Sequence, residues 1–259
     1  MKKHLFALIP LLLAAFCVRA DDDVVTFKVP LRMAVEDAFY EAFRYPTEVL
    51  DKSPEGVKRK KSRDAWRNVI EYDYGEEFTE GRVTVLYSVY RFGRISRPVV
   101  VKGLCPEIDK AVKKAMKQVC QRVTVDTRYN DAEYIQTFWI SPDGSVKTRV
   151  QADETVLMRP EEPSMPQGGK EGLVDFVAKN QRYPDRAREA GMQGTVETQF
   201  IIDEEGYVLA GCVYSSESAD LDCAALKVVA SIPQMTPACH HGVPVKSYWT
   251  WPIVYRLSR

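Results

Sequence analysis

The sequence has few of the residues that chemistry at an active site requires. It holds three histidines in total, and one of them, His4, lies in the first twenty residues. No serine or cysteine stands in a nucleophile-elbow motif, and Gly168-Gly169 is not a phosphate-binding loop because no predicted strand precedes it. These absences argue against nucleophilic catalysis and nucleotide chemistry. We expect neither an enzyme nor a bound cofactor.

An excess of charge of one sign is also missing. The 36 lysines and arginines balance 36 aspartates and glutamates, so the formal net charge is zero. No overall field therefore attracts nucleic acid. The one basic cluster, Lys58-Arg59-Lys60-Lys61 with Arg63 and Arg67, is interpreted as a solvated face. We expect no nucleic-acid partner.

Long hydrophobic runs are absent except for a short one at the start. Met1-Lys2-Lys3 precedes an apolar run from Leu5 to Val18, which is shorter than the roughly 20 residues of a membrane-spanning helix. Val18-Arg19-Ala20 then supplies the small residues that are typical of a cleavage site. We expect residues 1–20 to be a cleaved signal peptide. The alternative is that this segment is retained as an inner-membrane anchor.

Cysteine is sparse and, after the leader, odd in number. Export permits disulfides, and an odd number leaves at least one thiol without a partner in the same chain. Cys105 and Cys120 bracket one predicted helix, so about 20 Å separates them and they cannot bond to each other. We expect a disulfide among Cys212, Cys223 and Cys239, with the pairing left open.

The strands of the C-terminal third can be predicted from alternation. Residues 196–202 and 208–214 alternate and flank the turn sequence Asp203-Glu204-Glu205-Gly206, which predicts a β-hairpin. Alternation returns over residues 249–257 and predicts a last strand. Pro252 lacks an N–H, so this strand should lie at a sheet edge.

Two helices are predicted around that hairpin. An apolar stripe over residues 173–177 has helical spacing and ends before Pro184. Ser218 can cap a helix over residues 221–232, which Pro233 ends. We therefore expect two helices on one face of a three-stranded antiparallel sheet.

The same plan occurs twice in the sequence. Gly81, Gly93 and Asp109 have the same spacing as Gly194, Gly206 and Asp222, and Arg44-Tyr45-Pro46 resembles Arg182-Tyr183-Pro184. The repeat predicts an α+β fold of two related units, each a small antiparallel sheet with helices packed on one face. The first unit should contain strands over 83–89 and 134–140, a helix over 108–119, and an added strand near Val146.

The repeat also suggests a domain organisation. Residues 21–158 form the first unit and residues 170–259 the second. Residues 159–169 are rich in proline and glycine, which favours an interdomain linker.

Family motifs follow one another in the C-terminal third. They are Met165-Pro166-Gln167-Gly168-Gly169, Arg182-Tyr183-Pro184, Gly194-Thr195-Val196, Gly206-Tyr207-Val208, Leu221-Asp222, Gly242-Val243-Pro244-Val245 and Trp251-Pro252-Ile253. This ordered set resembles the C-terminal domain of the TonB energy-transducer family. The resemblance implies a periplasmic protein-binding module whose first unit is a degenerate copy. It also implies capture of a short extended segment of an outer-membrane transporter beside the last strand.

The resemblance also suggests which residues bind the partner. They are Asn180, Gln181, Arg182 and Tyr183, together with Tyr248, Thr250 and Val254, which we expect to face away from the core. Tyr183 could instead serve only to fix and pack a helix end. Cys239-His240-His241 has the residue types of zinc ligands, but it precedes a turn of the family, and we expect no metal there.

Two other functions stay open at this stage. A force-transmitting transducer would need a membrane anchor and a long proline-rich spacer, and neither is convincing in this sequence, so a soluble binder fits better. The chain could also be a structural or assembly protein that forms a homodimer through its edge strands. A membrane-retained energy transducer is the remaining alternative.

Overall fold

The computed structural model describes residues 29–51, 60–63, 69–72, 78–90, 93–124, 132–147, 155–215 and 218–257. The predicted signal peptide lies outside these residues, as do Lys58, Arg59 and Arg67 of the basic cluster. Among the residues described, no helix is long and apolar enough to cross a membrane.

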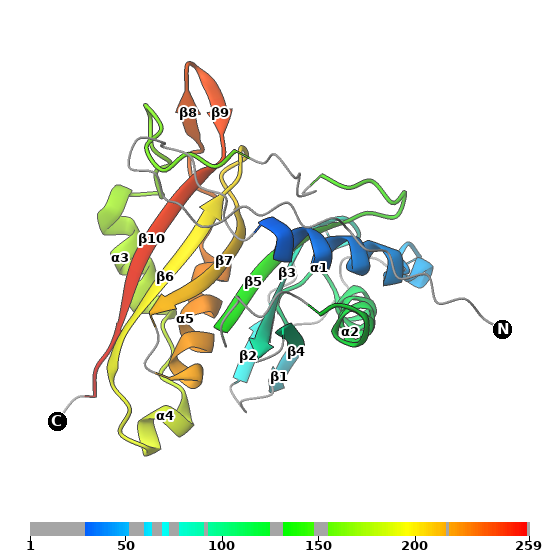
Figure 1. Ribbon diagram of the computed structural model, residues 1–259, viewed down its shortest axis with the longest axis horizontal. Helices are drawn as coiled ribbons and strands as arrows, with labels where there is room; N and C mark the ends of the chain where they lie inside the picture. The colour runs from blue at the N-terminus through cyan, green and yellow to red at the C-terminus, as the bar shows by residue number, and fades with distance from the viewer. Residues whose placement is uncertain are drawn as a thin grey trace.

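The centre of the fold is one antiparallel sheet with the strand order β10-β6-β7-β5-β3-β4 (Figure 1). Its strands are β3 (Gly81–Tyr90), β4 (Arg94–Lys102), β5 (Ala132–Ile140), β6 (Gly194–Ile202), β7 (Val208–Ser215) and β10 (Ser247–Tyr255). Two separate pairs of short strands are β1 (Lys60–Arg63) with β2 (Val69–Tyr72), and β8 (Ala238–His240) with β9 (Val243–Val245). The helices are α1 (Val29–Ala42), α2 (Pro106–Arg122), α3 (Gly169–Asn180), α4 (Asp185–Glu189), α5 (Ala219–Ser231) and the 3-10 turn η1 (Thr47–Val49).

The predicted local elements are confirmed. The hairpin is β6–β7, the last strand is β10, and the Ser218 hydroxyl caps α5 by accepting a hydrogen bond from the Leu221 amide at 3.3 Å. The first unit likewise has the expected strands and helix in β3, α2 and β5. The prediction of an added strand near Val146 is wrong, because the described residues after β5 form a turn and no strand.

The two predicted small sheets are joined into one. Strand β5 pairs with β7 through Tyr134 and Cys212, Ile135 and Gly211, and Gln136 and Ala210. Within the joined sheet, the two halves have the same internal strand order. In each half the first strand in sequence lies between the third and the second, as β5-β3-β4 in the N-terminal half and β10-β6-β7 in the C-terminal half. The fold is therefore α+β with a large antiparallel sheet.

The helices cover opposite faces of this sheet. On β5, Tyr134 and Phe138 point into the cluster that contains α1 and α2, whereas Ile135 points into the cluster that contains α3 and α5. Successive strand residues point to opposite faces, so each half of the sheet contributes side chains to both layers. The helix pairs therefore lie on different sides, α1 and α2 on one and α3 and α5 on the other.

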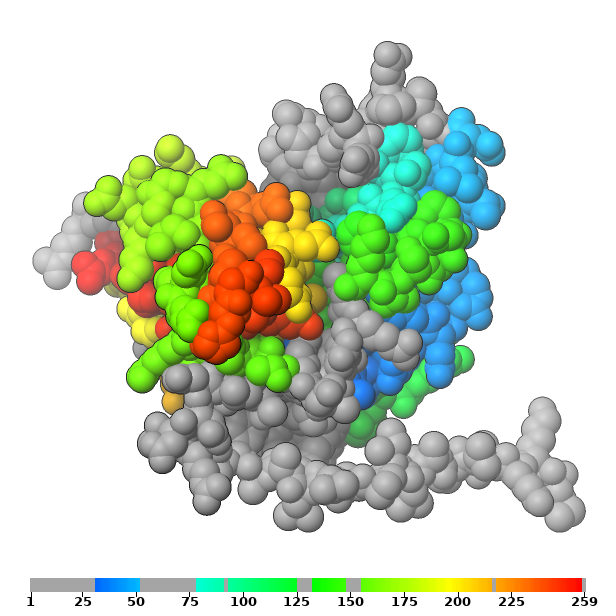
Figure 2. Space-filling model, turned by 90° about the horizontal axis from the view of Figure 1, so that it is seen from above, coloured from blue at the N-terminus to red at the C-terminus, as the bar shows by residue number. Residues whose placement is uncertain are grey.

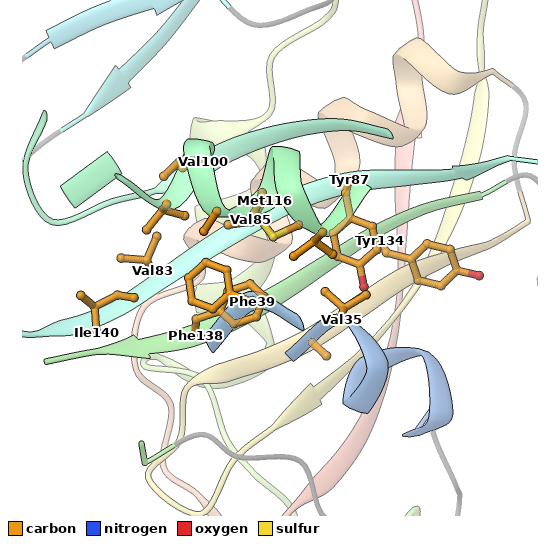
Figure 3. Close-up of a cluster of buried hydrophobic side chains, with 14 of the residues drawn as sticks. Val35, Phe39, Val83, Val85, Tyr87, Val100, Met116, Tyr134, Phe138 and Ile140 are labelled. Atoms are coloured by element: carbon orange, nitrogen blue, oxygen red, sulfur yellow. The ribbon is translucent and has the colours of Figure 1, made fainter. Parts of the chain in front are cut away.

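The first hydrophobic core lies between the sheet, α1 and α2 (Figure 3). Leu31, Val35 and Phe39 recur every fourth residue along α1 and are buried. The Phe39 ring stacks on Phe138 of β5, with ring centroids 4.1 Å apart. Met116 of α2 lies on the other side of the same cluster.

The second core crosses the junction between the halves. Helix α5 contacts β6 and β7 but also β3, β4 and β5. Leu86, Val99 and Ile135 of the N-terminal strands are buried in the same cluster as Leu226 and Val229 of α5. The two halves therefore share one hydrophobic layer.

A partly buried arginine makes a second connection between the halves. Arg82 of β3 donates to Glu205 at 2.9 Å and to Asp203 at 3.3 Å in the β6–β7 turn. Its guanidinium lies over the Tyr207 ring, 4.0 Å from the centroid, where a cation–π contact adds to the ion pairs.

No disulfide joins Cys212, Cys223 and Cys239, the cysteines that were expected to form one. Cys212 belongs to the cluster under α1 and α2, and Cys223 of α5 belongs to the cluster on the opposite face. The sheet therefore lies between these two sulfurs. Cys239 stands on β8, outside both clusters.

A buried carboxyl group makes stability depend on pH. Burial raises the pKa of Glu133, against the opposing effect of the hydrogen bond from the Ser88 hydroxyl at 2.6 Å. The folded chain then holds more protons than the unfolded chain between pH about 4.3 and the higher folded pKa. Stability should consequently fall as the pH rises through this window.

We expect Glu133→Gln to remove this fall, because an amide keeps the hydrogen-bonding shape without the cost of burying a charge. Urea unfolding at pH 4 and pH 8 measures the free energy of unfolding. Relative to the wild type, the variant should be more stable at pH 8 than at pH 4. Glu189→Gln, an exposed control, should change neither value. A lower stability of Glu133→Gln at pH 8 would contradict this view.

Candidate functional site

Strand β10 forms one margin of the sheet (Figure 1). It pairs with β6 along its whole length, from Ser247 opposite Ile202 to Tyr255 opposite Gly194. On its outer side, one residue of the described chain pairs with it: Leu157 forms a parallel bridge to Ser247. The edge position predicted from Pro252 is confirmed.

The backbone groups of the outer side can be assigned from two hydrogen bonds. The Tyr248 N–H donates to the Leu157 carbonyl at 2.9 Å, and the Val254 carbonyl accepts from the Gln181 side chain at 2.7 Å. Alternate residues of a strand direct their backbone groups to the same side. Thr250 and Pro252 therefore direct theirs outward as well, and Pro252 costs no bond in the ladder to β6.

A groove of about 280 Å³ runs beside this edge. One wall is β10 from Ser247 to Trp251, and the other is the strap, which we define as residues 157–165. Lys170 of α3 also lines the groove. The strap residues that line the groove are Met158, Pro160, Pro163, Ser164 and Met165.

The strap is hydrogen-bonded along its length and is held in place against the C-terminal half. Glu162 exchanges two backbone hydrogen bonds with Cys239 of β8, at 3.0 and 2.9 Å, and Met165 does the same with Thr236. Ser164 is fully buried, and its hydroxyl bonds to the Ser247 hydroxyl and accepts from the Trp249 indole. Figure 2 looks down on the strap lying against the orange-red β8–β9 hairpin.

The residues predicted just after α3 lie at the far end of the same edge. Gln181 binds the Val254 carbonyl, as described above. The Asn180 side chain instead donates to the Phe176 carbonyl at 2.8 Å and completes the end of α3. Arg182 is exposed. The Tyr183 hydroxyl donates to the Met192 carbonyl, and its ring packs edge-on against Tyr255, so Tyr183 has a structural role.

The predicted residues of β10 differ in how open they are. Thr250 is exposed, and Val254 is 43% exposed. Tyr248 was expected to face away from the core, but it packs against the cluster under α1 and α2. Burial raises the pKa of its hydroxyl accordingly. Thr250 and Val254 thus offer both backbone and side chain to a partner, and Tyr248 offers its carbonyl.

The strap and one side-chain cluster were not predicted from the sequence. Glu161 of the strap and His240 and His241 of the hairpin have metal-binding atoms that lie within 4.8 Å of one another. Cys239, the neighbour that completes the sequence motif, is not in this group. Neighbouring residues of a strand point to opposite sides, so alternation along β8 could have excluded Cys239 as a ligand beside His240. Glu161 is too distant in the sequence to be found from a motif.

Two comparisons with known proteins find matches in this region. Residues 179–257 match the family described as Gram-negative bacterial TonB protein C-terminal. Protein TonB of Pseudomonas putida is 34% identical over 93 residues, which make up 33% of this chain and 36% of that protein. The chain therefore spans about a third of the length of this curated relative. No solved structure matches. Residues 179–257 of this chain are a TonB C-terminal domain.

Proposed function

We propose that the chain captures an extended segment of an envelope protein by adding it as a strand beside β10. The observation that carries this proposal is the outer side of β10 from Thr250 to Val254, which no backbone of the described residues pairs with, next to a preformed groove. Exposed sheet edges bind extended peptides through main-chain hydrogen bonds, and neighbouring pockets select side chains. The TonB C-terminal domain suggests a role in TonB-dependent envelope transport, so the proposed partner is an outer-membrane transporter and the proposed location is the periplasm.

The geometry limits how the guest can bind. Thr250 offers an N–H and a carbonyl, whereas Pro252 offers a carbonyl alone. The Val254 carbonyl becomes available when the Gln181 side chain moves aside. A guest strand of about five residues would cover this stretch, with its strongest pairing at Thr250. Met158 and Met165, which are 43% and 38% exposed, would contact its side chains from the strap, and methionine adapts to different apolar partners.

Pro252 then protects the edge from indiscriminate pairing. Natural edge strands commonly use proline for this purpose. A ladder interrupted at one position still accepts a short guest, but it disfavours long pairing with a second copy of the chain. The structure thus fits a selective binder better than a scaffold that polymerises through β10.

We also propose that the two halves arose by duplication. Tyr45 lies three residues after the end of α1, and its hydroxyl donates to the Thr79 carbonyl at 2.7 Å, two residues before Gly81. Tyr183 lies three residues after the end of α3, and its hydroxyl donates to Met192, two residues before Gly194. The equal strand order of the halves supports the same proposal. The first unit has no free edge equivalent to β10, because its third strand, β5, pairs with β7.

The edge can be tested with Thr250→Pro. This change removes the outward N–H at the start of the open stretch and leaves the ladder to β6 intact. We expect affinity for peptides from the plug segments of TonB-dependent transporters to fall at least about tenfold. Fluorescence anisotropy with a panel of such labelled peptides measures this change.

Thr250→Val is the matched control, because it alters the same side chain and keeps the amide. It should bind within about twofold of the wild type, the range of a change of under 0.5 kcal/mol. Equal loss in both variants would contradict main-chain pairing. If no peptide binds and Thr250→Pro instead converts a wild-type dimer to a monomer in sedimentation, the edge serves assembly and the proposal is wrong.

A further inference from the structure

We propose that Glu161, His240 and His241 form a zinc-binding site that clamps the strap to the β8–β9 hairpin. The three residues come from segments far apart in the sequence, and they meet where Glu162 pairs with Cys239. Two imidazoles and one carboxylate are a known set of protein ligands for Zn²⁺, with the fourth position left to water. The site is independent of peptide capture at β10.

The contacts among the three side chains bring their donor atoms together. The Glu161 carboxylate accepts from the His241 backbone N–H at 2.9 Å, and its other oxygen lies 3.0 Å from His241 Nδ1. The His240 and His241 rings are 4.2 Å apart between centroids. Each histidine therefore lies beside the other and near the same carboxylate.

One possible metal-ligand atom makes no hydrogen bond to the described residues of the protein. Nδ1 of His240 is buried and has no hydrogen-bond partner among the described residues. A buried ring nitrogen without a partner is uncommon and requires an explanation, such as an ion. Zinc coordination would supply it.

The hairpin turn presents His241 in an unusual conformation. Its two turn residues, His241 and Gly242, have φ of 51° and 74°, as in the type I′ turns that most often carry Asn-Gly. Histidine at positive φ is tolerated but costs more than asparagine or glycine. Strained positions of this kind cluster at ligand clamps, and here the turn brings the imidazole to Glu161.

The present spacing allows coordination after a small adjustment. Tetrahedral zinc with bonds of about 2.1 Å holds its ligand atoms about 3.4 Å apart, whereas the donor atoms here lie within 4.8 Å of one another. Glu161 and His241 are exposed, so rotation of their side chains can close the difference. The metal would then link the strap wall of the groove to the hairpin in addition to the existing backbone hydrogen bonds.

The test uses the full chain, freed of any histidine tag and of metal by chelation, and titrated with ZnCl₂ in a calorimeter. We expect one equivalent to bind. His240→Ala, Glu161→Gln and His241→Asn should each weaken binding at least about tenfold. His241→Asn keeps a residue suited to the turn, so its loss of affinity cannot be attributed to misfolding. Glu162→Gln, a neighbouring carboxylate outside the cluster, should bind as the wild type does.

Two further measurements exclude alternatives. Co²⁺ spectra distinguish this site from metal binding by a cysteine thiolate, and hydrogen exchange shows whether the bound metal also stabilises the strap. Co²⁺ should give visible bands of tetrahedral coordination without a sulfur charge-transfer band, and Cys239→Ser should leave them unchanged. Zn²⁺ should slow exchange of the Glu162 and Met165 amides in the wild type and not in His241→Asn. The proposal is overturned if no zinc binds, if His240→Ala and His241→Asn bind as the wild type does, or if Cys239→Ser abolishes binding. None of these readouts involves a peptide, so they leave the proposed function separately testable.

Discussion

Ile135→Ala is expected to lower the free energy of unfolding by about 2–5 kcal/mol, and to loosen the C-terminal half although the residue lies in the N-terminal half. Ile135 on β5 is 2% exposed and is buried in the cluster formed by α5. Truncation would leave a cavity on the face that α5 covers. A loss of this size is a large fraction of the 5–15 kcal/mol that stabilises a typical domain.

The measurement is urea unfolding combined with native-state hydrogen exchange. If the shared core couples the halves, the amides of α5 and β6 should lose protection together with those of β3 and β5, in one cooperative unit. Tyr214→Ala on β7 is the control, because Tyr214 is 75% exposed and its truncation should cost under about 0.5 kcal/mol. Unchanged protection in α5, with loss confined to β3 and β5, would mean that the halves fold independently.

This coupling was not predictable from local sequence patterns. Alternation and capping identified the β6–β7 hairpin, α5 and β10, because those signals lie within a few residues of each other. The pairing of β5 with β7 joins residues far apart in the sequence, and no periodicity specifies it. Strand β3 did contain a clue, since Leu86 interrupts the alternation of Val85 and Tyr87 with an apolar residue on the opposite face. A strand that is apolar on both sides is buried on both sides.

The candidate site was predictable in part for a similar reason. Pro252 identified the edge because the loss of an N–H is a property of that residue alone. The sequence predicts a linker over residues 159–169, which include most of the strap, because an extended segment rich in proline has no period of its own. Its hydrogen bonds to Thr236 and Cys239, and the meeting of Glu161 with His240, depend on the tertiary fold.

Gly206→Ala is expected to be as damaging as the loss of a core side chain, at about 2–5 kcal/mol. Gly206 has φ of +87°, which L-residues rarely adopt, and a Cβ built there would lie far inside van der Waals contact with the Met235 carbonyl oxygen. The positive φ alone costs about 1–2 kcal/mol, and overpacking adds about 1–3 kcal/mol. The contact cannot be relieved cheaply, because the Met235 amide donates to the Gly206 carbonyl at 2.9 Å and holds the two backbones together.

The structure offers a control that separates these two causes. Gly144 has φ of +76°, but a Cβ there would meet nothing within 4 Å. Gly144→Ala should therefore lower the free energy of unfolding by about 1–2 kcal/mol in urea unfolding. The additional loss in Gly206→Ala then measures the cost of the close contact between Gly206 and Met235, which follows α5. Equal losses at the two glycines would mean that backbone conformation alone explains Gly206. A larger loss at Gly206 would explain why this chain has glycine at a turn that, by its φ alone, asparagine could also occupy.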